Sequence, residues 1–176
     1  KKKKKKKLIL CTNFFLIILC TDFFQVDLKK EEFDLTILLR NLIAEHFEDF
    51  EDKNIDIDVK IPDYPILVIG DKKEIKRAIE NLIINSYTHN KNGSKVYVSL
   101  YNKDKSSFIS IGDNGEKIPK DTDIFKAFVT SNKNRTGGKG TGLGLAISKR
   151  IIEKHGGTIE LKNTIGKYNK EFTLKI

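Results

Sequence analysis

The sequence predicts a two-layer α/β sandwich, with a mixed, mainly antiparallel sheet and three helices packed on one of its faces. Two observations lead to this fold class. Segments that alternate apolar and polar residues come in neighbouring pairs joined by short turns, which is typical of antiparallel hairpins. Three longer segments between them have apolar residues at helical spacing. Because each element has one apolar face, the helices and the sheet must bury those faces against each other.

The first half of the domain is predicted to contain two helices and two strands. Residues 25–32 are polar and are interpreted as a linker. Residues 33–50 have the i, i+3, i+4 apolar spacing of an amphipathic helix. Residues 54–61 alternate with period two, and residues 65–70 form a short apolar run that ends in glycine, so both are predicted strands. A capping-box pattern opens residues 71–89 and predicts the second helix.

The second half supplies the rest of the sheet and the third helix. Two alternating segments predict a hairpin, and two more close the chain. In chain order the predicted elements are strands 95–101 and 106–112, loop 113–119, short helix 123–128, polar segment 130–140, helix 141–155 and strands 158–163 and 170–176.

At 176 residues, with 39% hydrophobic and 32% charged residues, the chain is long enough for one domain with an appendage. We expect an N-terminal segment over residues 1–30 and the domain over residues 31–176. The chain begins with Lys rather than Met, so we interpret it as a fragment of a longer protein. Seven lysines precede an apolar run, LILCTNFFLIILC, which at about 13 residues is shorter than the roughly 20 of a spanning helix. A membrane anchor of the parent protein and a helix that packs on missing segments both stay open.

The net charge of +9 does not indicate nucleic-acid binding. Residues 1–7 supply seven of the 33 basic residues, which leaves 26 against 24 acidic residues, or +2, for the rest of the chain. We therefore expect no nucleic-acid partner. Cys11 and Cys20 lack metal-ligand spacing, and their small number fits a reducing compartment, so we expect a cytoplasmic domain.

Residues 137–157 (GGKGTGLGLAISKRIIEKHGG) hold seven of the chain's 12 glycines just before a predicted helix. The Walker pattern and the dinucleotide pattern both fail on this run, because their required glycines and lysine fall at other positions. A glycine loop that opens a helix still offers free N–H groups and the positive end of the helix dipole to a phosphate. The alternative is a flexible linker into a buried helix.

Two further patterns bear polar groups at the ends of predicted elements. Asn81, Asn85 and Thr88 form one polar stripe of the second helix, where carboxamide oxygens can bind Mg²⁺. Asp113 ends a strand and precedes Asn-Gly, so its carboxylate can accept a hydrogen bond from a purine amine, with Gly115 leaving room for the base. The alternatives are a solvated helix face and an ordinary Asx turn.

Together these stretches resemble the nucleotide-binding boxes of the GHKL ATPase superfamily. ENLIINSYTHN resembles the N box, DNGEKIP the G1 box, IFKAF the F box and GKGTGLGL the G2 box, and they come in the order and spacing of that family. The resemblance covers residues 31–176 and is strongest to the catalytic, ATP-binding domain of bacterial sensor histidine kinases. It implies the Bergerat-type ATP-binding fold.

The resemblance implies that the domain binds ATP and Mg²⁺. Asn85 would be the Mg²⁺ ligand with Asn81 assisting, and Asp113 would accept from the adenine amino group beside Gly115. The remaining nucleotide-binding residues that it implies are His89, Ile118, the lid cations Lys133 and Arg135, and the phosphate-wrapping Gly140, Thr141, Gly142, Leu143 and Gly144.

The residue four positions before the Mg²⁺ asparagine separates branches of the superfamily. Hydrolytic members typically have Glu there, whereas this chain has Asn81, which cannot act as a general base. This favours a histidine kinase, whose acceptor imidazole is itself a nucleophile. His46 lacks a phosphoacceptor context and is interpreted as structural, so the acceptor histidine is expected on a dimerisation helix hairpin upstream. The N-terminal stretch LIILCTDFFQVDLKKEE resembles the tail of that hairpin's second helix. The resemblance further implies a response regulator as partner and a homodimeric full-length protein.

Two departures from the family pattern keep alternatives open. Lys117 stands where a second G1 glycine is usual, and Thr88 replaces a common Lys or Arg. These changes leave room for a degenerate module that binds ATP without transferring phosphate. An ATPase clamp of the gyrase or Hsp90 kind is the third hypothesis, and Asn81 argues against it.

Overall fold

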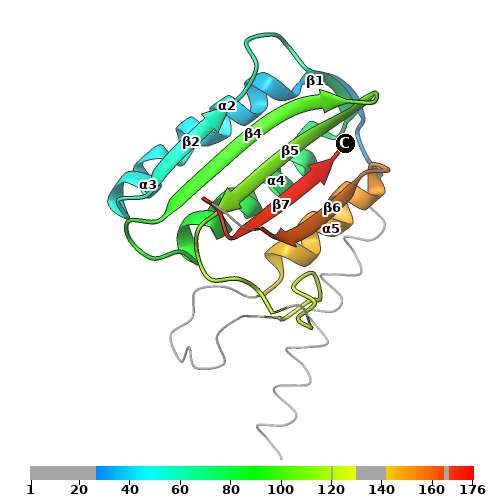
Figure 1. The fold of residues 1–176 in the computed structure, drawn as a ribbon. Helices are drawn as coiled ribbons and strands as arrows, with labels where there is room; N and C mark the ends of the chain where they lie inside the picture. The colour runs from blue at the N-terminus through cyan, green and yellow to red at the C-terminus, as the bar shows by residue number, and fades with distance from the viewer. Residues whose placement is uncertain (1–26, 120, 130–141, 165–166) are drawn as a thin grey trace, which may run out of the picture.

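The computed structural model describes residues 27–119, 121–129, 142–164 and 167–176. A five-stranded sheet forms one layer, and the helices cover one of its faces (Figure 1). Two further strands, β1 and β3, form a separate ribbon. The strands are β1 (Glu31–Asp34), β2 (Asp56–Lys60), β3 (Leu67–Gly70), β4 (Lys95–Lys103), β5 (Ser106–Asp113), β6 (Thr158–Asn163) and β7 (Lys170–Lys175). The helices are α2 (Leu35–Glu45), α3 (Phe47–Asp52), α4 (Lys72–Thr88) and α5 (Gly144–Lys154).

The large sheet is mixed and mainly antiparallel, which confirms the predicted fold class. Its strand order is β2-β4-β5-β7-β6, and β2 runs parallel to β4 while the other three pairs are antiparallel. Alternate residues of the strands face the helices, and burying each large aliphatic side chain contributes about 1.5–3 kcal/mol. The buried residues of the central strands and of α4 are Val96, Val98, Leu100, Ile109, Ile111, Ile75, Ala78, Ile79, Leu82 and Ile83.

The ribbon of β1 and β3 corrects the prediction of a linker that runs directly into a helix. β1 pairs antiparallel with β3, from Glu31 opposite Gly70 to Asp34 opposite Leu67. Phe33 is buried in the core instead of starting a helix. Asp34 then caps α2, because its Oδ1 accepts from the Thr36 N–H at 2.8 Å. The polar composition of this stretch hides the strand, since the strand depends on a partner far along the chain.

The helix predicted over residues 33–50 is in fact two helices. α2 ends at Glu45, and His46 has φ −107° and ψ 9° before α3 begins. The His46 ring lies between two carboxylates, with Nδ1 3.1 Å from Asp49 Oδ2 and Nε2 3.4 Å from Glu80 Oε1. Apolar spacing continues across the break to the buried Phe50, so the pattern alone does not reveal it.

The short helix predicted over residues 123–128 is wrong, because these residues form turns. The Asp123 carboxylate accepts from the Phe125 N–H at 3.1 Å, and the Lys126 N–H donates to the Asp123 carbonyl at 3.2 Å. An aspartate that bonds to nearby backbone in this way competes with helix formation. The last helix begins at Gly144, three residues later than residues 141–155 suggested.

α4 and α5 pack antiparallel and are joined near both ends. The Asp71 N–H, just before α4, donates to Nε2 of His155, just after α5, at 2.9 Å. Nδ1 of the same ring lies 2.7 Å from the Ile151 carbonyl. Because a backbone N–H only donates and a carbonyl only accepts, Nε2 of His155 accepts and its Nδ1 donates. The start of α5 contacts Asn81, so about two turns of α4 extend past it.

None of the helices within the described residues combines the length and the apolar composition needed to cross a bilayer. Residues 1–26, to which the anchor and hairpin-tail interpretations apply, lie outside the described residues. Both interpretations of that segment therefore stay predictions.

Candidate functional site

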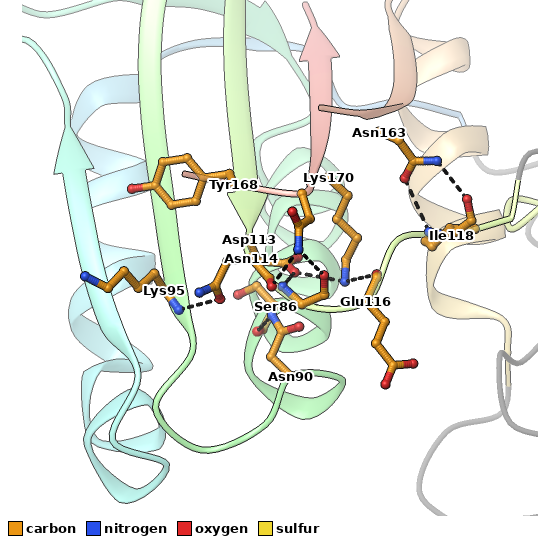
Figure 2. A network of polar contacts seen from close by, with 12 residues as sticks. Ser86, Asn90, Lys95, Asp113, Asn114, Glu116, Ile118, Asn163, Tyr168 and Lys170 are labelled. Carbon is orange, nitrogen blue, oxygen red and sulfur yellow. Dashed lines mark hydrogen bonds and ion pairs between the residues drawn. The ribbon is translucent and has the colours of Figure 1, made fainter. Parts of the chain in front are cut away.

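A buried ion pair lies at one edge of the sheet, beside the end of α4. Asp113 ends β5, and Lys170 begins β7 directly opposite it. Lys170 Nζ is 2.8 Å from Asp113 Oδ1, and the two side chains are 10% and 3% exposed. Lys170 Nζ also donates to the Glu116 carbonyl at 3.1 Å (Figure 2). The predicted base-binding carboxylate is therefore held in place by a cation that sequence reasoning missed.

Gly115 lies where two side-chain oxygens converge. Its N–H donates to Asp113 Oδ1 at 2.8 Å. A Cβ at this position would be 1.9 Å from Asn90 Oδ1 and 2.8 Å from Asp113 Oδ1. Both distances are far below a normal contact, so a side chain fits here only if Asn90 or the loop moves. The crowding comes from the protein's own side chains, so the expectation that Gly115 leaves room for a base stays a prediction.

Asn90 adds a second acceptor at this place, which sequence reasoning also missed. Its Nδ2 donates to the Ser86 carbonyl at 2.7 Å, and this contact fixes which end of the carboxamide faces the helix. Its Oδ1 is buried and has no hydrogen-bond partner among the described residues. Figure 2 shows the Asn90 side chain beneath the strand end that carries Asp113. Because buried acceptors are rarely left unpaired, this atom marks a place built for more than packing.

Hydrogen bonds to residues far away in the sequence hold the loop after β5. Asn114 Oδ1 accepts from the Lys95 N–H at 2.7 Å. Asn169 Nδ2 donates to the carbonyls of Asn114 and Gly115, at 2.9 and 3.0 Å. The Asn163 carboxamide forms two hydrogen bonds with the Ile118 backbone, accepting at 3.3 Å and donating at 2.8 Å. These contacts make the loop a fixed part of the site (Figure 2).

The departure at Lys117 causes no strain in this loop. Among the described residues, positive φ at non-glycine positions occurs at Asn54, Asp104, Lys105 and Phe128. Lys117 therefore adopts a backbone conformation that any residue can take.

The polar stripe of α4 connects to the start of α5. Asn81 Nδ2 donates to the Gly144 carbonyl at 3.3 Å and to Ser148 Oγ at 3.2 Å. This orients Nδ2 toward α5, and Asn85 follows one turn later on the same face. The Thr88 hydroxyl donates to the Ile84 carbonyl at 2.7 Å, so Thr88 is engaged by its own helix.

The start of α5 lacks a side-chain cap. Leu143 is the N-cap residue and forms no side-chain capping bond, whereas α2 and α4 are capped by aspartates. Leu143 therefore offers the first N–H groups of α5 no side-chain acceptor, and the helix dipole adds positive potential. Gly142, at φ +67°, accepts a hydrogen bond from the Phe128 N–H at 2.9 Å. The two chain segments cross here, because a Cβ on Gly142 would be 3.0 Å from the Phe128 backbone.

The predicted site residues divide into three groups. Asp113 and Gly115 lie together beside the end of α4, where base binding is predicted, with Ile118 bound to Asn163 further along the loop. Asn81 and Gly144 are in contact further back along α4, and the exposed His89 follows α4 as its C-cap. The residues that lie outside the described part of the chain are Lys133, Arg135, Gly140 and Thr141.

Comparison with known proteins identifies the family. Residues 70–176, more than half of the chain, match the family described as histidine kinase-, DNA gyrase B-, and HSP90-like ATPase. The chain belongs to this ATPase family. Its relatives include sensor histidine kinase WalK of Bacillus subtilis, 33% identical over 132 residues, with 72% of this chain and 22% of that protein covered. Sensor protein GtcS of Aneurinibacillus migulanus is 36% identical over 109 residues, with 61% and 29% covered. The chain thus spans less than a third of these relatives.

Solved structures of histidine kinases share the fold of this ATPase domain. The catalytic domain of histidine kinase ThkA has a TM-score of 0.73 at 28% identity, with 84% of this chain and 97% of that chain covered. The mycobacterial sensor histidine kinase MprB gives 0.69 at 26% identity, with 83% and 95% covered. A complex of ThkA with its response regulator TrrA matches at 0.75 and 24% identity, which shows the fold alone.

The residues present fit ATP better than a protein-built metal site. The unpartnered Asn90 oxygen and the uncapped start of α5 lie at opposite ends of the same stretch of α4, as a base and a phosphate chain require. Among the described residues no group of three or more His, Cys, Asp or Glu side chains is placed to hold a metal ion. Mg²⁺ typically takes one or two protein oxygens and completes its shell with phosphates and water, which suits Asn81 and Asn85.

Proposed function

We propose that this chain binds Mg-ATP and transfers the γ-phosphoryl group to a histidine on a separate dimerisation domain, for relay to a response regulator. The proposal rests on one observation, which is that two polar features lie against the same stretch of α4. The paired Asp113 lies at its end and the uncapped start of α5 lies at Asn81. The sensor kinases among its relatives support the reaction class.

Base recognition would rest on Asp113. Among the described residues, its side chain contacts the Gly115 N–H and Lys170, both through Oδ1. Its Oδ2 can therefore accept from the exocyclic amine of adenine. Guanine has an acceptor at that position, which a carboxylate repels, so we expect the site to select ATP over GTP.

Phosphate binding would use α4 and α5 together. The Asn85 carboxamide oxygen, assisted by that of Asn81, would hold Mg²⁺, which neutralises charge on the phosphates when bound. The N–H groups at the start of α5 would donate to phosphate oxygens, and the bond from Asn81 Nδ2 to the Gly144 carbonyl fixes that helix end against α4.

The side chains near Asn81 favour phosphotransfer over hydrolysis. A carboxamide cannot take a proton from water, and the neighbouring Glu80 is turned toward His46, with Oε1 3.4 Å from Nε2. A histidine acceptor needs no such base, because its imidazole is already nucleophilic. In this proposal the domain is cytoplasmic and the parent protein is a homodimer. The parent protein supplies the acceptor helices and has a response regulator as its partner.

Phosphotransfer is tested by mixing the chain with the phosphoacceptor helix hairpin of its parent protein and γ-labelled ATP. We expect acid-labile, alkali-stable label on the hairpin. Asn85→Ala should abolish the labelling, and Lys175→Met, on an exposed part of β7, should leave it unchanged. Tight ATP binding without any labelled hairpin would instead establish a module that holds ATP without transferring phosphate. Release of free phosphate would favour an ATPase clamp.

A further inference from the structure

We propose that Lys170 is a specificity-determining residue that donates a hydrogen bond to ring nitrogen N1 of adenine. It would do so beside Asp113, which accepts from the adjacent amino group. The inference rests on the proposed function, because it needs a nucleotide whose base lies at Asp113. It gives the buried ion pair a part in base recognition as well as in folding.

The position of Lys170 on β7 directs its side chain to the base end. Along β7 the residues Lys170, Phe172 and Leu174 are buried and alternate with partly exposed ones, so all three point to the helix side of the sheet. Lys170 is also the cross-strand partner of Asp113. Two neighbouring strand ends therefore present a cation and a carboxylate side by side (Figure 2).

The ammonium group of Lys170 keeps a donor for a ligand. An ammonium has three N–H donors. The described residues take two of them, Asp113 Oδ1 at 2.8 Å and the Glu116 carbonyl at 3.1 Å. The Lys170 side chain is 10% exposed, and two contacts fix its ammonium group. The third N–H is therefore held near the Asp113 carboxylate.

The acceptor of Asp113 and the donor of Lys170 are arranged to complement adenine and not guanine. Adenine presents an amino donor next to the N1 acceptor, and guanine presents an O6 acceptor next to an N1–H donor. The free Oδ2 of Asp113 and the third N–H of Lys170 form the complementary acceptor and donor pair for adenine. A guanine in the same pose would place acceptor against acceptor and donor against donor.

A lysine that only neutralised Asp113 would act in the same way whatever atom occupies position 1 of the base. The two roles therefore separate when N1 is removed and the amino group is kept. We use 1-deaza-ATP, in which a C–H replaces N1, and compare its affinity with that of ATP by calorimetry in the presence of Mg²⁺.

The protein should bind 1-deaza-ATP about tenfold more weakly than ATP, which is the loss of one hydrogen bond from a charged donor. Lys170→Met should bind both nucleotides with similar affinity, while Lys175→Met keeps the tenfold preference. Equal affinities in the unsubstituted protein would overturn the role of Lys170 and leave ATP binding intact. Binding of neither nucleotide would overturn the proposed function and this inference together.

Lys170→Met removes the partner of a buried carboxylate and can fail to fold. The comparison of the two nucleotides on the unsubstituted protein needs no variant and decides the question by itself. As a second variant, Asp113→Asn with Lys170→Met removes both charges of the pair. It should fold and bind ATP and 1-deaza-ATP equally, and a retained tenfold preference would overturn the proposal.

Discussion

The two ends of the site on α4 are built in opposite ways. At the base end, an ion pair and a set of hydrogen bonds join strand ends and the following loop into a fixed network. At the phosphate end, a helix begins at a glycine with no side-chain cap. Under the proposed function, this difference means that the base pocket is set in advance and that the phosphate end keeps its N–H groups for the ligand.

The backbone next to the start of α5 also contains a residue in a strained conformation. Phe128 has φ +66° and its side chain is half exposed, while its N–H is bound to the Gly142 carbonyl. A bulky residue in this region costs about 1–3 kcal/mol and persists only where its surroundings enforce it. Such strain where the Phe128 and Gly142 segments cross favours a functional role for this crossing.

The largest effect is expected from breaking the base-end ion pair. Lys170→Met leaves Asp113 buried and uncompensated, which should lower the free energy of unfolding by about 3–5 kcal/mol. Lys175→Met, an exposed lysine on the same strand, should change it by no more than about 0.5 kcal/mol. Urea unfolding measures both. Equal losses in the free energy of unfolding for the two substitutions would contradict the view that the ion pair fixes the structure around Asp113.

Gly115→Ala should be the next most damaging change. Its Cβ would lie 1.9 Å from Asn90 Oδ1, so the loop or Asn90 must move, at about 1–3 kcal/mol in the free energy of unfolding. In an Asn90→Ala background the same substitution should cost clearly less. If the cost is the same in both backgrounds, Asn90 is not what confines the glycine.

Gly144→Ala should have a small effect on stability and a clear effect on binding. The nearest atoms to its Cβ are those of Asn81 at 3.6 Å, an ordinary contact, and the helix gains up to about 1 kcal/mol from the substitution. Calorimetry should show weaker ATP binding, because a methyl group now stands at the helix start, with adenosine binding unchanged. Unchanged ATP affinity would remove the start of α5 from the phosphate site.

The smallest effect concerns the capped start of α4. Burial alone would raise the pKa of Asp71, but hydrogen bonds from the backbone of Glu74 and Lys29 outweigh it and lower that pKa below 3.8. A lowered folded-state pKa means that the carboxylate stabilises the fold above 3.8 and loses this contribution as the pH falls below it. Asp71→Ala should cost about 1 kcal/mol at pH 7, and the difference should shrink in urea unfolding toward pH 3. A constant difference would contradict the capping role.

The sequence predicts α4 and the hairpins of the sheet well, because these depend on local periodicity and on one capping residue. The Asp71 cap is confirmed by its bond from the Glu74 N–H at 3.1 Å. β1 was missed because its pairing with β3 lies in no local pattern. The break at His46 was missed because apolar spacing continues through it.

The candidate site could be read from the sequence only in part. Asp113 and Gly115 end a strand and stand out locally, but Lys170 is 57 positions away and pairs with Asp113 through strand register. One signal was available in KEFTLKI. Lys170 alternates in step with the apolar Phe172 and Leu174, so it falls on the same, buried face of the strand. Asn90 gave no signal, because an asparagine at a helix end usually indicates a cap or a turn.

The central claim is that this chain holds Mg-ATP between a preset base pocket and an uncapped helix. Calorimetry of the chain with ATP and with GTP, each with and without Mg²⁺, tests it most directly. We predict that ATP binds more tightly than GTP, that Mg²⁺ strengthens ATP binding, and that Asn85→Ala removes the Mg²⁺ effect while keeping the preference for ATP. No binding of either nucleotide, or equal affinities for ATP and GTP, would contradict it.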